Sequence, residues 1–241
     1  AGVGRGTTVD YCEVGLNLDD GFEMFGGTVD LKHCVVFAVG DDAFDTDNGY
    51  QGRGQFLVVV RADDSDKAHE MDSKTEGDLD SQPRSHPHFA NVTVMSSVGH
   101  GEDALRLREG TGGDFRNYII HGANDGVRND DNGSEVVTQD WSAADAAGHP
   151  NYLYISSSIV MNGLGGDPWD DFDEDTDGEW SGNYVMESAG LHYAVDSNGL
   201  PSEVDLTPSA SGSAYTDVDE LIADGWFESV NYKGAVGSVN W

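Results

Sequence analysis

A fixed interval of 22 residues constrains the fold of this chain more than any other feature of its sequence. The run DDGFE at 19–23 returns as DDAFD at 41–45, and Cys12 returns as Cys34. A period in the twenties is typical of a solenoid, in which each repeat forms one coil and stacks on its neighbours. We therefore test the interval along the rest of the chain.

The interval recurs beyond the first two repeats. It separates ALR at 104–106 from GVR at 126–128, and it places QFLVVV at 55–60 and Asp63-Asp64 on a third repeat. Between the acidic marks lie short β-rich runs bounded by Gly, Asp and Asn, at 9–14, 29–39, 56–61, 89–95, 115–121 and 152–161. Strands of this kind in a 22-residue period predict an all-β fold, a right-handed parallel β-helix of about seven coils.

Three segments interrupt the period and are expected to leave the coils as loops. They are polar or acidic and occupy residues 73–87, 132–150 and 164–183. Insertions in a solenoid often emerge on one face, which is commonly the functional one. We interpret residues 1–241 as a single domain. Because the chain lacks an initial Met and enters a strand pattern almost at once, we expect it to be a piece of a longer protein.

The charge of the chain excludes some classes of partner. There are 45 Asp and Glu against 12 Lys and Arg, a formal net charge of −33. Such a surface repels nucleic acid and anionic membranes and attracts cations, so we expect no nucleic-acid partner. No apolar run approaches the length of a membrane span, and we expect no direct membrane insertion. A solvated, salt-adapted surface explains most of this charge, and a dedicated cation site is the alternative for part of it.

The repeated cysteines predict a disulfide. Residues one coil apart in a parallel β-helix lie about 4.8 Å apart, which is within the Cα window for a disulfide. We therefore predict a bond between Cys12 and Cys34, which implies an oxidising compartment outside the cytosol. The alternative is a pair of reduced, buried thiols.

Two acidic groups are candidate calcium sites. Stacked carboxylates repel each other unless a cation lies between them, and hard oxygen ligands suit Ca²⁺. The first group is a ladder; the alternative is that its Asp pairs make the turns between coils. The second resembles a DxDxDG calcium loop but lacks a Glu at the twelfth position. The predicted ligands are Asp41, Asp42, Asp45 and Asp47 on the ladder, and Asp173, Asp175, Asp177 and Glu179 in the loop.

Several long motifs resemble a known family. They are DDGFEMFGGTVDLKHCVVFAVGDDAFDTDNGYQGRGQFLVV, RLREGTGGDFRNYIIHG and DGWFESVNYKGAVGSVNW. In order and spacing they are similar to those of secreted bacterial parallel β-helix proteins of the pectate-lyase-like type, over nearly the whole chain. The resemblance implies an exported right-handed β-helix. It implies no activity, since none is established for that family, and fold transfers more safely than function.

Arginines and aromatic residues give weaker candidates. In pectate-lyase-like enzymes an arginine beside calcium-bound acids acts as the base, so Arg106 and Arg108 are catalytic candidates; the alternative is that they pair with acids of adjacent coils, such as Asp103 or Asp130. Aromatic residues of the third insertion are candidates for stacking on sugars: Trp169, Trp180 and Tyr184.

Together these features favour a non-catalytic function. We predict an exported, calcium-stabilised surface or assembly protein. Because the ends of a β-helix present unpaired strand edges, we expect either end-to-end association or a cap supplied by a longer native chain. The alternatives are a calcium-dependent polyuronate lyase and a carbohydrate-binding module. A lyase requires acids and arginine to converge on one face, and a binding module requires a row of exposed rings.

Overall fold

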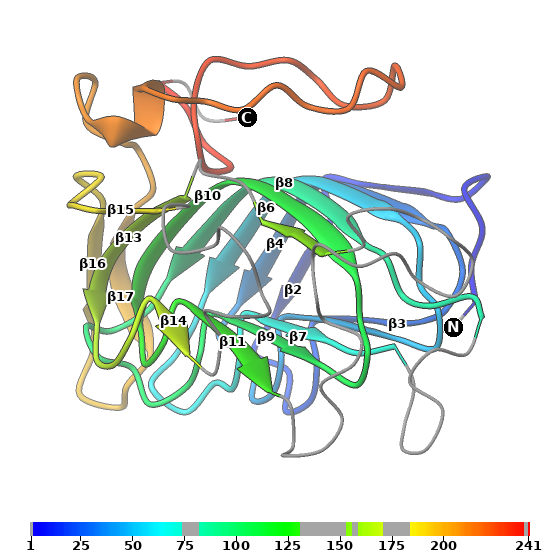
Figure 1. Ribbon diagram of the computed structural model, residues 1–241. Helices are drawn as coiled ribbons and strands as arrows, with labels where there is room; N and C mark the ends of the chain where they lie inside the picture. Colours follow the sequence, from blue (N-terminus) through cyan, green and yellow to red (C-terminus); the bar gives the residue numbers. More distant parts are fainter. Residues whose placement is uncertain (1, 74–81, 131–152, 156–158, 171–183, 239–240) are drawn as a thin grey trace.

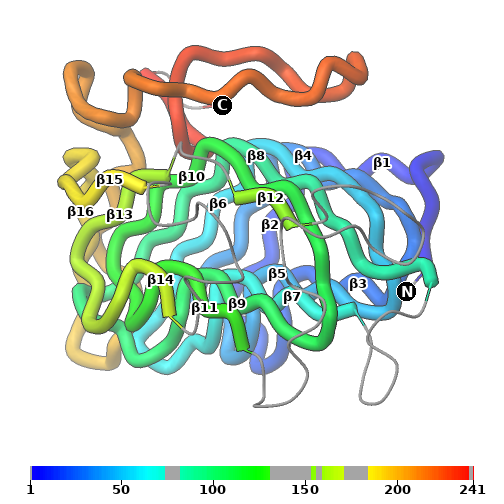
Figure 2. Tube along the Cα trace, viewed as in Figure 1, coloured from blue at the N-terminus to red at the C-terminus, as the bar shows by residue number. Residues whose placement is uncertain are grey.

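The computed structural model describes residues 2–73, 82–130, 153–155, 159–170, 184–238 and 241. In these ranges the chain winds through two parallel sheets that face each other across a common core (Figure 1). The tube in Figure 2 shows successive coils stacked side by side, from the blue N-terminal coil to the yellow one. The predicted parallel β-helix is confirmed.

The larger sheet follows the order β1-β4-β6-β8-β10-β13-β15, with β2 also pairing β4 and β12 pairing β10. All of these pairings are parallel. Its strands are β1 (Thr8–Asp10), β2 (Glu13–Gly15), β4 (Asp30–Phe37), β6 (Arg53–Val60), β8 (His88–Met95), β10 (Gly113–Ala123), β12 (Leu153–Ile155), β13 (Ile159–Leu164) and β15 (Tyr184–Met186).

The smaller sheet has six strands in the order β14-β11-β9-β7-β5-β3, and every pairing is again parallel. Its strands are β3 (Phe22–Phe25), β5 (Phe44–Asp47), β7 (His69–Met71), β9 (Leu105–Arg108), β11 (Val127–Asp130) and β14 (Trp169–Asp170). Because side chains alternate along a strand, each strand sends one set of residues inward and the next set to the surface.

Stacked columns of side chains build the core. Phe22 pairs in register with Phe44, and their rings stack at 5.4 Å between centroids, as the repeat predicts. The same inward column continues through the later strands as His69, Leu105, Val127 and Trp169. A single cluster of buried side chains joins these residues to the inward face of the larger sheet.

The repeat interval is less regular than the sequence indicates. It is 22 residues from β1 to β4 and from β9 to β11, but Cys34 pairs with Leu57 at 23 residues and Phe44 pairs with His69 at 25. The predicted placement of Gln55 and of Asp63-Asp64 in the third repeat is therefore wrong by one and by three residues. The third coil holds extra residues, which a search for a constant interval does not detect.

One left-handed residue recurs in five successive coils of the larger sheet. Tyr11, His33, Phe56, Asn91 and Asn117 have φ between +49° and +59°, and the register places them in one column. Asn tolerates this conformation better than most residues, whereas aromatic side chains adopt it seldom. Here Tyr11, His33 and Phe56 stack on one another, with centroids 4.3 and 5.1 Å apart, which stabilises the column.

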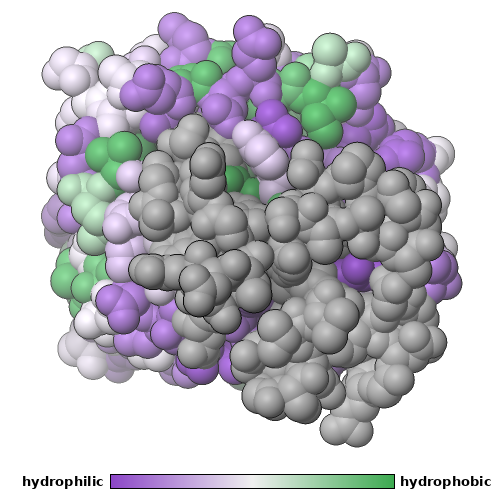
Figure 3. Space-filling model, in the orientation of Figure 1, coloured by the Kyte–Doolittle hydropathy of each residue, from purple (hydrophilic) through white to green (hydrophobic). Residues whose placement is uncertain are grey.

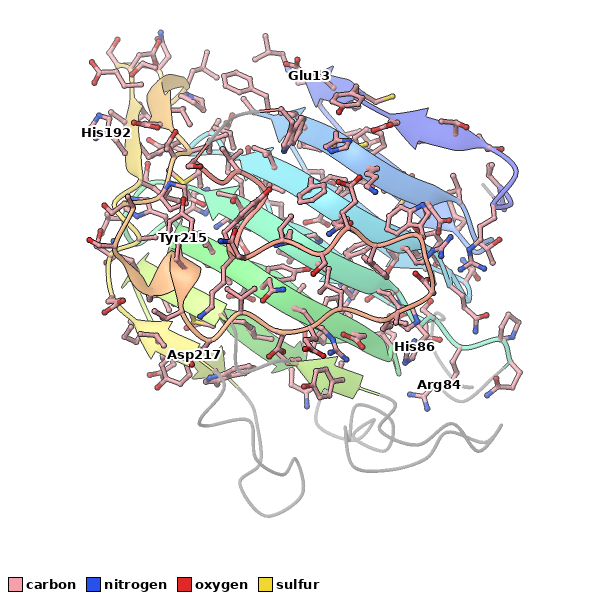
Figure 4. All side chains as sticks on the ribbon, turned by 90° about the horizontal axis from the view of Figure 1, so that it is seen from above. Glu13, Arg84, His86, His192, Tyr215 and Asp217 are labelled. Atoms are coloured by element: carbon pink, nitrogen blue, oxygen red, sulfur yellow. The ribbon has the colours of Figure 1, made fainter. Side chains whose placement is uncertain are left out.

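The end of the chain folds back over the outer face of the larger sheet (Figure 1). An antiparallel hairpin of β16 (His192–Val195) and β17 (Pro201–Asp205) packs Tyr193 against Val58, Val60 and Met95. The short 3₁₀ helix η3 (Ser213–Tyr215) follows, and then an extended segment, residues 216–238, that we call the strap. Seen from above, Tyr215 and Asp217 lie over the late coils, whereas Glu13 marks the first coil at the opposite edge (Figure 4).

The strap is bound by side chains from successive coils. Gln55 exchanges two hydrogen bonds with the backbone of Glu228, Asn117 exchanges two with that of Asp219, and Asn91 donates one to the carbonyl of Tyr232. Beyond the strap, Trp241 packs on His33 with ring centroids 4.9 Å apart. No helix among the described residues is long and apolar enough to cross a membrane.

Candidate functional site: the charged ladders of the six-stranded sheet

A short pattern precedes each strand of the smaller sheet: two residues of which at least one is Asp, then Gly, Ala or Pro, and then the inward residue. The small residue is required because the coils approach closely there; a Cβ on Gly21 would lie 2.5 Å from the carbonyl oxygen of Ala43. Backbone hydrogen bonds extend the strand register through this turn. The second residue of the pair therefore forms a column, which we call the turn ladder: Asp20, Asp42, Lys67, Asp103, Asp125 and Asp167.

Carboxylates of the turn ladder bind backbone amides of the next coil. Oδ1 of Asp20 accepts a hydrogen bond from the N–H of Asp42 at 3.0 Å, and Oδ1 of Asp42 accepts one from the N–H of Lys67 at 2.8 Å. Asp125 binds the N–H of Asp167 in the same way at 2.6 Å. These bonds satisfy the backbone at each corner, so turn formation accounts for much of the repeated acid.

The strands themselves carry a second set of charges on their outer face, which we call the strand ladder. The residue that follows the inward one forms the column Glu23, Asp45, Glu70, Arg106, Arg128 and Asp170. Two residues further on, Phe25, Asp47, Asp72, Arg108 and Asp130 form a parallel column. Acids of the early coils and arginines of the later coils thus share one face of one sheet.

Neutralisation of this face is uneven. In the first two coils, carboxylate oxygens of Asp19, Asp20 and Asp41, and of Asp20, Glu23 and Asp45, lie within 4.8 Å of one another. Among the described residues, no Lys or Arg lies within ion-pair distance of any of these five. These five acids therefore repel one another without a Lys or Arg partner among the described residues.

Burial, together with this crowding, raises the pKa of several carboxyl groups. Burial first, and then the charge of Glu70, raises the pKa of Asp42 to about 8. Burial and the charges of Asp72 and Asp20 raise the pKa of Asp45 to about 8. Burial also raises the pKa of Asp20 to about 6. One oxygen of Asp45 is buried and has no hydrogen-bond partner among the described residues.

From the third coil onwards the chain supplies its own cations. Lys67 lies 2.7 Å from Asp66 and 3.4 Å from Glu70, and only 8% of its side chain is exposed. Arg108 pairs with Glu70 and Asp72, each at 2.8 Å. Arg106 pairs with Asp130, and Arg128 pairs with Asp170 at 3.6 Å.

The catalytic candidates are therefore engaged in ion pairs. In the structure Arg106 pairs with Asp130, which was the alternative interpretation of this residue. Burial lowers the pKa of Arg108, but the hydrogen bond from its guanidinium to Asp72 and the charges of Asp72 and Glu70 outweigh burial and raise it above its usual range. A guanidinium held in this way is a poor proton acceptor, so the geometry does not favour Arg108 as a base.

Some predicted metal ligands are placed and others are not described. Asp42 lies on the turn ladder with Asp41 directly before it, Asp45 lies on the strand ladder, and the carboxylate of Asp47 binds the backbone and side chain of Asn48. Asp66, not Asp63 or Asp64, joins Asp41 and Asp42 in a third acidic cluster. The loop ligands Asp173, Asp175, Asp177 and Glu179 lie outside the described residues.

The aromatic candidates do not form an exposed row. Trp169 is 7% exposed and ends the inward column of the smaller sheet, so its predicted role in sugar stacking is wrong. Tyr184 on β15 is partly buried and meets Trp169 edge to face, with centroids 6.1 Å apart. Trp180 lies outside the described residues. The sequence misled here because it placed Trp169 in an insertion, whereas Trp169 pairs in register with Val127 on β11.

The predicted disulfide is absent, and both Cys12 and Cys34 are free thiols. The backbone N–H of Val35 donates to the carbonyl of Cys12, so the two cysteines are one coil apart as predicted. Each thiol instead donates to the carbonyl two residues before it, Asp10 for Cys12 and Lys32 for Cys34. Burial raises the pKa of the Cys34 thiol to about 12, which keeps it protonated.

Sequence reasoning missed the cation at the centre of the site. Lys67, Glu70 and Asp72 lie in the run DKAHEMD at 66–72, which matches the earlier DDGFEMF at 19–25 if three residues are added to the interval. The shared EM dipeptide is the signal that could have found it. The fixed interval of 22 hid the match.

Sheet order, register and stacked ladders define this protein as a parallel β-helix with a charged lateral face. A family model described as "Pectate-lyase like beta helix domain" matches residues 1–149, more than half of the sequence. The chain belongs to this family. The comparisons with curated proteins and with solved structures found no match.

Proposed function

We propose that this protein is a non-catalytic, exported structural or assembly protein, in which divalent cations, calcium foremost, stabilise the first coils of the β-helix. The observation that carries the proposal is the uneven neutralisation of the charged face. Five acids of the first two coils crowd together without Lys or Arg within ion-pair distance among the described residues. The third coil, with Lys67, has an internal counter-ion for the same ladder.

Calcium suits the early coils on chemical grounds. It takes six to eight oxygen ligands at about 2.3–2.6 Å and tolerates irregular geometry, as mixed Asp and Glu clusters require. Asp20 belongs to two of the acidic clusters, and Asp45, which has one buried oxygen without a hydrogen-bond partner among the described residues, belongs to one of them. A bound cation would offset both causes of the raised pKa of these groups, burial first and then mutual repulsion.

The ion pairs of the arginines support a structural role for the charged face. Arg106, Arg108 and Arg128 each have a carboxylate partner on a neighbouring coil. Pairs of this kind hold adjacent coils together. A polyuronate lyase is the second candidate, because acids and arginines do converge on one sheet face as such an enzyme requires.

Association through the first coil is the assembly part of the proposal. Strand β3 is an edge of the smaller sheet, and β1 and β2 are at the edge of the larger one. Apolar side chains are exposed in this coil: Leu18 is 93% exposed, Leu16 66% and Tyr11 64%. On the face seen in Figure 3, apolar residues outside the grey area form small patches between hydrophilic ones. An unpaired edge with exposed apolar residues favours pairing with another chain.

Thermal unfolding tests the cation part of the proposal. The melting temperature is measured with calcium, with magnesium and with excess chelator, at low and at high sodium chloride. We expect a calcium-specific rise that persists at high salt and that Asp45→Asn reduces, while Asp64→Asn, at an exposed acid off the ladders, leaves it unchanged. An equal response to any salt at equal ionic strength would overturn the calcium proposal.

Two further assays separate the remaining parts. Light scattering over a wide concentration range should show association that Leu18→Ser weakens, and a monomer at every concentration contradicts end-to-end assembly. Incubation with polyuronates in the presence of calcium should release no unsaturated product. Product that disappears with Arg108→Gln but not with Arg116→Gln would establish the lyase instead.

A further inference from the structure

A cleft lies beside the first coils on the larger sheet, whereas the charged ladders belong to the smaller sheet. It has a volume of about 230 Å³ and is formed by β1, the starts of β4 and β6, and the strap. Its walls include Arg5, Thr8, Asp30, Lys32, Arg53 and Trp226. None of the ladder residues lines it.

This cleft gathers several of the few cations of an acidic protein. Arg5, Lys32 and Arg53 are three of only 12 Lys and Arg in a chain of net charge −33. The lining contains two carboxylates, and both are engaged: Asp30 pairs with Arg5 and Arg53, and Asp10 with His33. Asp224 and Glu228 of the strap pair with Arg53 and Lys32 from outside the lining. Counting these two, three cations face four carboxylates, so an oxyanion on Lys32 would take the place of Glu228, whose side chain is 58% exposed.

Two of the cations are fixed in place before any ligand arrives. The Arg53 and Lys32 side chains are 15% and 16% exposed, and they lie 4.7 and 5.0 Å from the centroid of the Trp226 ring. Lys32 also donates to the carbonyl of Trp226 at 3.2 Å. Such preorganised donors lose little conformational entropy on binding.

The third cation stands at the mouth. Arg5 is 48% exposed, and its guanidinium lies 3.3 Å from Asp30 and donates to the carbonyl of Gln51 at 3.1 Å. A guanidinium has five donors, so several remain for a ligand. Thr7 and Thr8 add exposed hydroxyl groups, and Val9 and Trp226 add apolar wall. The site thus joins a cationic centre to a wall suited to a small ring with hydroxyl groups.

We propose that this cleft binds a small organic anion of monosaccharide size that carries one oxyanion group, a carboxylate, sulfate or phosphate, with the oxyanion on Arg5 and Lys32. The site is independent of the calcium proposed for the ladders. Binding persists in excess chelator, which distinguishes failure of one proposal from failure of the other. Its function is the selective capture of an anion by a protein whose remaining surface repels anions.

Calorimetric titration of the full chain tests this site, with chelator present and at two salt concentrations. The probes are glucose 6-sulfate, glucose 6-phosphate, glucuronate and neutral glucose. We expect saturable binding of at least one charged probe, weaker at high salt, with glucose at least about tenfold weaker, since a charge-assisted hydrogen bond is worth about 1.5–3 kcal/mol. The charged probe that binds best identifies the oxyanion.

Two variants locate the binding. Arg5→Gln should weaken the binding of the best charged probe at least about tenfold, because it removes the half-exposed cation at the entrance of the cleft. Arg116→Gln removes an arginine from the same sheet, paired with Asp114 at 2.6 Å, and should leave binding unchanged. If Arg5→Gln lowers the melting temperature, Thr8→Val, an exposed and nearly isosteric change, gives the deciding measurement. Equal binding of glucose, no saturable binding of any probe, or unchanged binding in both cleft variants would overturn the proposal.

Discussion

Lys67 occupies the position in the turn ladder that Asp42 occupies one coil earlier, and its Nζ lies 4.0 Å from the carboxylate of Asp42. The backbone N–H of Lys67 also donates to Oδ1 of Asp42 at 2.8 Å. The ladder therefore changes sign at the coil where the interval lengthens. This one substitution divides the charged face into a repulsive part and a neutralised part.

Removal of this cation should destabilise the protein. Lys67→Met leaves Asp42, Asp66 and Glu70 without their shared counter-ion, and loss of one partner of a buried ion pair costs about 3 kcal/mol or more. Urea unfolding at neutral pH measures the loss. Lys67→Arg, which keeps the charge, should retain most of the stability, and added calcium should restore part of it in Lys67→Met. A loss below about 1 kcal/mol contradicts this account.

Stability should fall as pH rises from about 5 to 9 at low salt without calcium. The folded-state pKa of Asp20, Asp42, Asp45 and Asp72 is raised to about 6, 8, 8 and 7, above the ordinary value of 3.8. Groups with a raised folded pKa stabilise the folded state below their unfolded pKa, and this contribution is lost as pH rises through the folded pKa. Urea midpoints across this range measure the effect.

Two controls define the source of that pH dependence. Asp45→Asn should flatten the decline between about pH 7 and 9, since the pKa of Asp45 is about 8. Saturating calcium should flatten it too if the proposed ion holds these groups ionised. Stability that rises steadily from pH 5 to 9 in chelator is incompatible with the raised pKa values.

The core histidine should limit stability in acid. His69 is fully buried in the inward column, and neither ring nitrogen has a hydrogen-bond partner among the described residues. Burial lowers its pKa to about 3, so the stability that its neutral form contributes above pH 6.5 is lost as pH falls towards 3. His69→Leu, which matches Leu105 on the next strand, should remove this loss and raise stability by about 1–3 kcal/mol.

Calorimetry at pH 7 and pH 4 distinguishes the two effects of that change. The gain from His69→Leu should be larger at pH 4 than at pH 7. His192→Leu serves as the control, because His192 is an exposed histidine on β16 and should change neither value. A gain that is equal at both pH values would assign the effect to packing alone.

The strap should detach locally when its amide contacts are lost. Asn117 donates to the carbonyl of Asp219 at 3.1 Å and accepts from its N–H at 2.9 Å, and it has φ of +58°. Asn117→Gly removes both bonds and keeps the left-handed backbone accessible, so we expect a loss of about 1–3 kcal/mol. Hydrogen exchange of residues 216–238 should accelerate while that of β6 and β8 does not. Uniform acceleration of all three would show that the strap does not open by itself.

The fold was largely predictable from the sequence because a coil is a local unit with a visible period. Phe22 over Phe44 followed from the interval alone. The third coil was not predictable in the same way, since three added residues move Asp66 and Lys67 into the ladder in place of Asp63 and Asp64. A ladder depends on register, and register is set by the packed core.

The candidate sites were likewise only partly predictable from the sequence. That Arg106 and Arg128 are one coil apart followed from spacing, whereas the partners of Arg108 on β7 did not. The cleft was beyond sequence reasoning altogether. Its walls join Arg5 to Trp226, and only the return of the strap brings these residues together.

That return path alters how the whole molecule comes apart. In a plain solenoid each repeat contacts only its neighbours, so end coils fray and unfolding proceeds piece by piece. Here Trp241 packs on Tyr11 and His33 of the first two coils, while the strap also binds Asn117 on β10. Early and late coils therefore share one set of contacts, and a coil at either end cannot fray without loosening the other. The coils should therefore unfold together, in a single cooperative transition.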